Sequence, residues 1–231
     1  MGWLIATYRP VSLFSLRASQ ATSSGGRTNL VPTMYAVKMA LIDVAFRSGE
    51  DGSKLFPLVK SLPVRFEPPE EAVVSNTFIK IRREPKQKSP DGPAYIPTVG
   101  FREFCHYRGE LRIAFDAKIL GEPGQARLME LLPRLNYLGK RGSFFQFVSI
   151  GDLEELPLSF GRPLDDGAMD FPLDTVIQYL DDFGDQATWQ RVNSYSDDTP
   201  KLGRDRVFVP MAFPYRRVAS SRGYTRYLRT V

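Results

Sequence analysis

Four consecutive pieces of sequence decide the fold: AVVSNTFIKIRR (72–83), EPKQKSPDGPAY (84–95), VGFREFCHY (99–107) and GELRIAFDA (109–117). In the last piece, apolar and polar side chains alternate, which is the period of a β-strand. In the first piece, the same period places the β-branched side chains from Val73 to Ile81 mainly on one face and the cations Lys80 and Arg82 on the other. The third piece is also rich in strand-forming residues, whereas the second is basic and broken by prolines. Together they predict an extended β-hairpin followed by a half-buried strand.

The sequence before and after this segment predicts two helices and further strands. Apolar side chains recur at helical spacing between Met34 and Val44 and predict a helix over about 32–47. Five leucines predict a second helix over 125–138, ended by Gly139. This order predicts an α+β fold of the ferredoxin-like kind, with the helices over one face of the sheet. The other expected elements are strands at 3–16, 144–150 and 206–213 and a short helix within 174–183.

The composition excludes several classes of protein. The chain has 231 residues, which suffices for one substantial hydrophobic core. A single cysteine excludes an internal disulfide, and a single histidine excludes a zinc site with two or more imidazoles. No apolar run reaches the length of a membrane-spanning helix. We therefore expect no membrane segment, no metal and no cofactor.

Charge is distributed unevenly along the chain. The net charge is +5, but residues 201–231 carry +7, residues 151–200 carry −10 and the first 150 residues carry +8. A basic surface suits a phosphate backbone, and an acidic one suits solvent or a basic protein neighbour. We therefore expect the acidic carboxylates at the surface and away from any nucleic acid, including those of Asp165, Asp166, Asp181 and Asp182.

A short basic loop with two glycines is the sharpest local motif. It reads Gly139, Lys140, Arg141, Gly142 and Ser143. The glycines permit a positive φ and close approach of a ligand, and the cations and free N–H groups suit a phosphate. The alternative is a helix that ends at a glycine, with cations that complement the helix dipole.

The predicted hairpin is a second candidate for RNA binding. It interleaves cations with Tyr95, Phe101 and Tyr107, and such mixtures stack bases and follow phosphates in single-stranded RNA. The alternative is an ordinary exposed hairpin whose aromatic side chains lie in the core. Two further cations, Arg17 and Arg27, flank a flexible polar loop. The hairpin cations are Lys80, Arg82, Arg83, Lys86, Lys88, Arg102 and Arg108.

The pair Cys105 and His106 suggests a thiol dyad, but neighbours on a strand point to opposite faces. A nuclease that uses His106 as a general base with Tyr107 or a lysine is the catalytic alternative. A lone histidine is more often structural, so we expect no catalytic residue.

Several segments resemble a known family. They are the opening strand, TNLVPT (28–33) with its helix, FREF (101–104) before the strand 111–115, and YLGKRGSF (137–144). They are similar to the RAMP-type CRISPR Cascade subunit that caps the 5′ handle of the CRISPR RNA (crRNA). The resemblance covers about residues 3–150.

The resemblance implies an RRM-related, ferredoxin-like RNA-binding domain over 1–150, with a protruding thumb hairpin at about 79–104. Residues 151–231 would form an irregular and β-rich extension, acidic over 151–200 and basic over 201–231. The implied partners are crRNA, adjacent Cascade backbone subunits, the large subunit and, through the complex, target DNA. The implied location is the prokaryotic cytoplasm, without a membrane. Most family members lack nuclease activity, although those of one subtype process precursor crRNA. The resemblance therefore predicts a non-catalytic subunit that binds the crRNA handle in a multisubunit CRISPR effector. The alternatives are a metal-independent endoribonuclease and a stand-alone RNA-binding protein.

Overall fold

The computed structural model describes residues 2–22, 25–87, 91–140, 142–164 and 174–231. Its centre is an antiparallel sheet of β1 (Trp3–Pro10), β5 (Val64–Glu67), β8 (Leu111–Asp116) and β9 (Phe145–Leu153). The strand order across this sheet is β5-β8-β1-β9. With one helix after β1 and one after β8, the chain order is β-α-β-β-α-β, which is the ferredoxin-like topology. The predicted fold class is confirmed.

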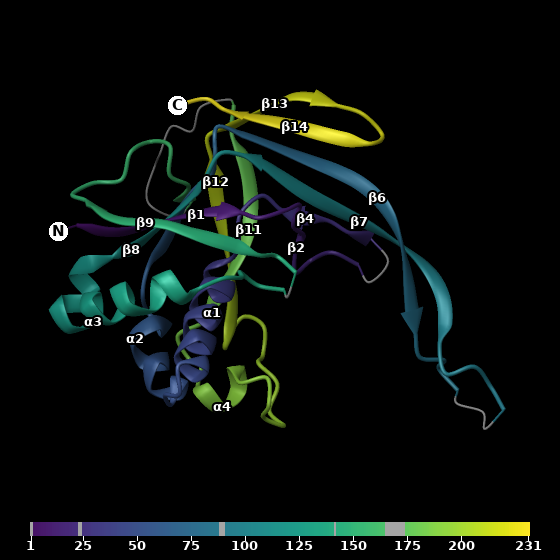
Figure 1. The fold of residues 1–231 in the computed structure, drawn as a ribbon, viewed down its shortest axis with the longest axis horizontal. Helices are drawn as coiled ribbons and strands as arrows, with labels where there is room; N and C mark the ends of the chain where they lie inside the picture. The colour runs from purple at the N-terminus through teal and green to yellow at the C-terminus, as the bar shows by residue number, and fades with distance from the viewer. Residues whose placement is uncertain (1, 23–24, 88–90, 141, 165–173) are drawn as a thin grey trace.

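Helices cover one face of this sheet (Figure 1). Thr33 caps the first helix, because its hydroxyl accepts a hydrogen bond from the N–H of Ala36 at 3.1 Å. The apolar stripe of this helix is fully buried, and Tyr8 on β1 donates a hydrogen bond to the carbonyl of Leu132 at 2.8 Å. The helical elements are α1 (Met34–Arg47), the 3-10 turn Gly52–Leu55, α2 (Phe56–Lys60), α3 (Ala117–Leu131) and the 3-10 turn Leu132–Arg134.

The second helix lies earlier in the chain than its leucines predict. The prediction of 125–138 is wrong at both ends, since α3 starts at Ala117 and ends at Leu131. Pro133 follows in a 3-10 turn, and by Leu135 the backbone is extended. Gly121, at φ +61°, interrupts the start of the helix. Gly139 therefore does not end a helix.

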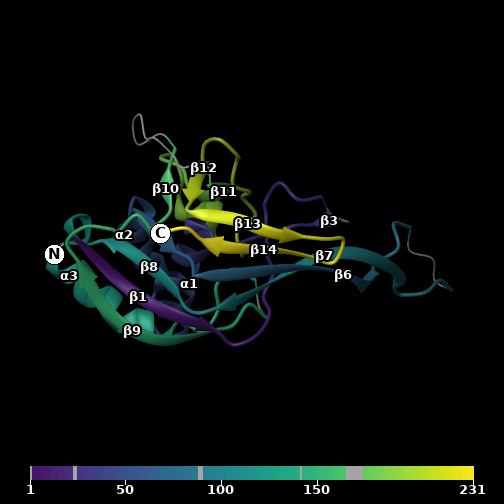
Figure 2. The same cartoon turned by 90° about the horizontal axis from the view of Figure 1, so that it is seen from above.

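A second sheet carries the long hairpin. Its strands are β6 (Glu71–Arg83), β7 (Ile96–Arg108), β13 (Tyr215–Ser220), β14 (Tyr224–Arg229) and the two-residue β3 (Gly25–Gly26). The order is β13-β14-β6-β7-β3. We call β6 and β7 the thumb hairpin, because their outer ends project beyond every other strand (Figures 1 and 2). Near the base, Ala72, Val74, Cys105 and Tyr107 face the core and are buried.

The basic C-terminal residues are not a free tail. They form the hairpin of β13 and β14, and β14 pairs antiparallel with β6 from Tyr224 opposite Ser75 to Leu228 opposite Glu71. Arg226 reinforces this pairing with an ion pair to Glu71 at 2.7 Å.

A small sheet of β10 (Arg162–Pro163), β12 (Arg206–Phe213) and β11 (Val176–Phe183) packs on α1 (Figure 1). The short helix predicted within 174–183 is wrong, because this segment pairs with β12 along its whole length. The remaining elements are β2 (Leu16–Arg17), β4 (Thr28–Asn29) and the four-residue α4 (Trp189–Val192).

Two of the acidic side chains expected at the surface instead form ion pairs shielded from solvent: Asp181 is buried, and the side chain of Asp182 is 18% exposed. Lys38 of α1 is 1% exposed, contacts Asp182 at 2.7 Å and donates to the carbonyl of Lys60 at 3.0 Å. Asp181 is paired with Arg206. A buried carboxylate requires such a partner, because the charge has lost its water. The surface prediction is therefore wrong for both residues, while Asp165 and Asp166 lie outside the described residues.

No helix in the described ranges is long and apolar enough to cross a membrane.

Candidate nucleic-acid interface

The strand register divides the thumb hairpin into two faces. Phe78 lies opposite Phe101, Lys80 opposite Val99, and Arg82 opposite Pro97. Paired residues of an antiparallel ladder share a face, and every second residue returns to it. Phe78, Lys80, Arg82 and Phe101 therefore lie on one face, which we call the thumb face.

The thumb face is exposed and combines rings with cations. Phe78 is 73% exposed and meets Phe101 edge to face, with ring centroids 5.6 Å apart. Within the part of the chain that the structure describes, Lys80 and Arg82 have no carboxylate partner. Both positive charges are therefore available to a ligand beside an aromatic surface.

The other predicted cations of the hairpin are distributed differently. Thr77 lies opposite Arg102, and Arg83 lies opposite Ile96, so both arginines belong to the opposite face. Arg102 covers Gly26 so closely that a Cβ on this glycine would come within 2.3 Å of the guanidinium. Lys86 is exposed beyond the end of β6. Lys88 lies outside the described residues.

The glycine loop forms a tight turn between extended segments. Tyr137 and Phe144 form a β-bridge, and within the turn the N–H of Ser143 donates to the carbonyl of Lys140 at 3.1 Å. Gly139 has φ +75° and Gly142 has φ +100°. Other residues rarely adopt these values, so the positive φ expected from the sequence is confirmed.

The side chains of this loop differ in exposure. Ser143 is buried, and its hydroxyl lies 3.5 Å from the carbonyl of Ser15. Lys140 is exposed, and Arg141 lies outside the described residues. Of these two predicted phosphate-binding residues, only Lys140 has a side chain that a phosphate can reach.

Arg17 and Arg27 line two different cavities. A cavity of about 900 Å³ is bordered by Arg17, Gly139 and Lys140, so the structure brings these three predicted residues together. A second cavity, of about 780 Å³ at the base of the thumb hairpin, is bordered by Arg27 and Phe101.

The residues of the catalytic alternative do not converge. His106 is exposed, whereas Cys105 and Tyr107 point from the opposite side of β7 into the core. Tyr107 donates its hydroxyl proton to the carbonyl of Leu30, and burial raises its pKa well above the ordinary value. Burial likewise raises the pKa of the Cys105 thiol. A tyrosine held this way cannot exchange a proton with a substrate near His106.

Among the described residues, no group of three His, Cys, Asp or Glu side chains lies close enough to hold a metal ion.

Sequence reasoning missed Phe78 as part of the interface. The sequence TFIKIRR (77–83) could have indicated it, because every second residue of a strand lies on the same face, which groups Phe78 with Lys80 and Arg82. It also missed Asn29 and Trp189, which line the larger cavity. Those two residues are brought there by tertiary contacts that no local pattern encodes.

No protein-family model matches this chain. Its sequence is 24% identical over 212 residues to the CRISPR-associated protein Cas5 of Archaeoglobus fulgidus, covering 89% of each protein. Its fold is similar to the crystal structure of a CRISPR protein from Archaeoglobus fulgidus, with a TM-score of 0.50 and 12% identity. That likeness covers 100% of this chain and 93% of the other. The sequence relative and the shared fold together confirm the resemblance to a CRISPR-associated RAMP subunit, and they extend it well beyond residue 150.

Proposed function

We propose that this chain is a non-catalytic, crRNA-binding subunit of a multisubunit CRISPR effector of the Cascade kind, and that it holds the 5′ handle of the RNA. The observation that carries this proposal is the thumb face, where Lys80 and Arg82 follow the exposed Phe78 along the outer half of β6. Cations that follow a phosphate backbone beside a ring that stacks a base are the usual means of binding single-stranded RNA.

The shape of the thumb hairpin supports a role in assembly. It projects from the body (Figure 1). Its thumb face exposes Phe78 and Val99 at 73% and 61%. Exposed apolar side chains that cluster on one surface mark a site of interaction. In this proposal the hairpin lies between the RNA and an adjacent backbone subunit, the body contacts the large subunit, and target DNA is reached only through the complex. The assembly would work in the prokaryotic cytoplasm.

The remaining predicted residues have supporting roles in the proposal. Lys140 and the backbone of the glycine loop contact a phosphate, together with Arg141. Arg27, Arg83, Arg102, Lys86 and Lys88 contribute positive potential around the thumb hairpin.

Binding without cleavage is the form of the proposal that the site geometry supports. General acid–base catalysis needs two groups within reach of the same substrate, and Tyr107 faces away from His106. Purified protein incubated with repeat RNA without divalent metal should leave the RNA intact. Specific cutting that disappears in His106→Ala would establish the endoribonuclease alternative instead.

Co-purification from the cells of origin tests the proposal as a whole. The untagged chain should carry a short RNA with a uniform 5′ end and several partner proteins. RNA of random sequence without partners would favour a stand-alone RNA-binding protein. Absence of RNA from the purified assembly would contradict the proposal.

A further inference from the structure

The cavity of about 780 Å³ at the base of the thumb hairpin, which we call the thumb-base cleft, has walls from three parts of the chain. The second sheet contributes Phe101 and Glu103 of β7 and Tyr227 of β14. The small sheet contributes β11 from Val176 to Tyr179, and the segment between β2 and β4 contributes Arg27. Aromatic, cationic and anionic side chains therefore line one hollow.

The strand register makes the thumb-base cleft continuous with the thumb face. Phe101 lies on that face opposite Phe78, and Glu103 is two residues closer to the body on the same side of β7. Two residues of a strand span about 6.8 Å, so Phe101 and Glu103 are neighbours on this surface. A single RNA strand that follows the thumb face towards the body therefore passes from the exposed rings to Glu103.

Glu103 is held in place and still has one free oxygen. Its Oε2 accepts a hydrogen bond from the N–H of Thr28 at 2.9 Å, which fixes the carboxylate against the start of β4. Within the described ranges, its Oε1 has no partner. The one side-chain polar atom of these ranges that is both buried and unpartnered is the Asn29 nitrogen, so Oε1 of Glu103 is open to solvent. A donor that enters the cleft can reach it.

Two arginines outweigh the charge of Glu103 in the cleft. Arg27 and Arg217 line it, both are exposed, and neither pairs with a carboxylate in the described part of the chain. The three charges act on one group, the Tyr227 hydroxyl: burial raises its pKa most, Glu103 adds to the rise, and Arg217 and Arg27 oppose it. The cleft thus offers a carboxylate oxygen to a donor and two cations to a phosphate.

Arg206 holds two walls of the cleft together. It begins β12, pairs with Asp181 of β11, and donates to the Ser19 hydroxyl at 3.2 Å in the segment between β2 and β4. The residues on either side of Ser19, Ala18 and Gln20, line the cleft. This segment and β11 are therefore fixed relative to each other.

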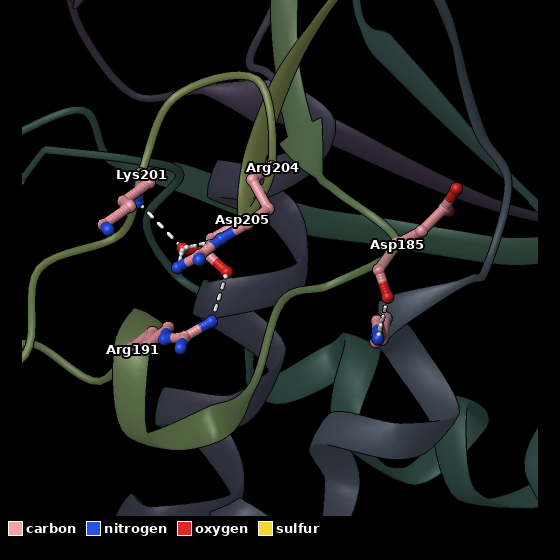
Figure 3. A network of polar contacts seen from close by, with 6 residues as sticks. Asp185, Arg191, Lys201, Arg204 and Asp205 are labelled. Atoms are coloured by element: carbon pink, nitrogen blue, oxygen red, sulfur yellow. Dashed lines mark hydrogen bonds and ion pairs between the residues drawn. The ribbon is translucent and has the colours of Figure 1, made fainter.

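The residue before Arg206 anchors it in turn. Asp205 is fully buried and accepts from Arg191 at 3.3 Å and from Arg204 at 2.9 Å (Figure 3). It also accepts from the N–H of Lys201 at 2.9 Å, and we call these contacts the Asp205 network (Figure 3). Because contacts within the chain hold the walls, a ligand of the cleft does not have to order them, which favours affinity.

We propose that the thumb-base cleft receives one base of the single-stranded RNA and that Glu103 sets the preference for that base. Cytosine, adenine and guanine carry an amino group that donates to Oε1 of Glu103, whereas uracil has carbonyl oxygens in its place, which a carboxylate repels. The base lies beside Phe101, and its phosphate lies near Arg27. This inference rests on the proposed function and adds to it a selection against uracil.

The experiment measures the affinity of the full chain for two labelled eight-nucleotide RNAs, oligo(C) and oligo(U), by fluorescence anisotropy. Homopolymers present the same base to the cleft in every register, and the two pyrimidines have rings of the same size, so the comparison isolates the amino group. The wild type should bind oligo(C) about tenfold more tightly than oligo(U), the discrimination that one well-placed hydrogen bond to a base edge supplies.

Glu103→Gln tests the assigned residue directly. The amide keeps an oxygen for the N–H of Thr28 and places an NH₂ group where Oε1 was, so it donates to a uracil carbonyl. The affinity for oligo(U) should rise, and the ratio between the two RNAs should fall to about one. The matched control, Glu122→Gln, removes the same charge from an exposed glutamate of α3 and should keep the tenfold ratio.

Arg27→Gln tests the phosphate contact at an exposed position, where folding is not at risk. It should weaken the binding of both RNAs alike and lower the slope of log affinity against log salt by about 0.7, the contribution of one phosphate contact. The ratio between oligo(C) and oligo(U) should stay at the wild-type value. An unchanged slope would overturn the placement of the phosphate.

The outcomes separate this inference from the proposed function. A wild type that binds both homopolymers equally would overturn the base selection and leave the proposed function standing. A tenfold ratio that survives in Glu103→Gln would overturn the role of Glu103, and a ratio that falls equally in Glu122→Gln would reduce the effect to net charge. A full chain that binds neither homopolymer nor handle RNA would overturn both proposals.

Discussion

Replacing Lys80 and Arg82 together with alanine removes both cations of the thumb face and leaves its aromatic pair in place. The two positions are two residues apart on β6, so their side chains emerge about 6.8 Å apart on the same face. Because neither cation has a carboxylate partner among the described residues, the substitution breaks no ion pair there. The stability of the free protein should therefore change little.

The expected effect appears in the salt dependence of RNA affinity. Each phosphate contact to single-stranded RNA contributes about 0.7 to the slope of log affinity against log salt, so losing two lowers the slope by about 1.4. Over a fourfold rise in salt, the affinity gap between wild type and variant should narrow by about sevenfold. The gap itself should be largest at low salt.

The assay is anisotropy of labelled handle RNA at several salt concentrations. A matched control, Lys54→Ala with Lys118→Ala, removes the same charge from two exposed lysines far from the thumb face. If the control flattens the slope as much as the thumb variant, the effect is one of net charge, and the assignment of the thumb face is refuted. An unchanged slope in the thumb variant refutes it as well.

Three other predictions concern the body and the loop. Lys38→Met should destabilise the fold by up to about 3–5 kcal/mol in chemical denaturation, because it leaves the partly buried Asp182 carboxylate without its cation, and adding Asp182→Leu should recover most of the loss. The hydrogen bond from Arg204, followed by those from Lys201 and Arg191, lowers the pKa of Asp205 from 3.8 to about 2. Its carboxylate therefore stabilises the fold above about pH 4, and this contribution is lost as the pH falls towards 2. Asp205→Asn should make the melting temperature less dependent on pH between 4 and 2. The same pH dependence in wild type and variant would contradict this role of the Asp205 network. Trypsin should cut the free protein after the exposed Lys86 and spare it in the RNA-bound assembly, because the sequence around Lys86 has few apolar side chains to hold it in place without a ligand. Equal cutting in both states would show that this segment does not contact the RNA.

Local patterns predicted those parts of the fold that depend on local contacts. The helix from Met34 to Arg47 was found because its apolar period matches a helix packed on one face. The thumb hairpin was found because its two strands are joined by one loop. Its predicted strands, 72–83 and 99–107, lie within one residue of the observed outer bounds, Glu71 and Arg108, but the second strand begins three residues earlier than predicted, at Ile96.

The missed elements depend on partners distant in sequence. β5 has four residues and is held by β8, so its own pattern is too short to identify. β11 was predicted as a helix, although Ile177 and Tyr179 alternate with half-buried or buried neighbours as in a strand. The hairpin of β13 and β14 is added to the sheet by the pairing of β14 with β6, a strand about 150 residues earlier in the chain.

Charged residues were the hardest to place from the sequence. Asp182 lies within an acidic run that predicts a solvated surface, and its partner Lys38 is 144 residues away. The glycine loop was recognised from its residues. Its position beside Arg17 could not be predicted, because it depends on the packing of β2 against the loop.

The pairing of β14 with β6 has a consequence for the order in which the protein folds. Arg226 and Glu71, which pair across the two strands, are 155 residues apart in the sequence. During synthesis, β6 therefore presents an unpaired edge until residues 224–228 have left the ribosome. Such an edge can pair with other chains, and contacts this distant in sequence slow folding. A nascent or C-terminally shortened chain should accordingly be prone to self-association, and early capture of the thumb hairpin by RNA or a neighbouring subunit would protect it.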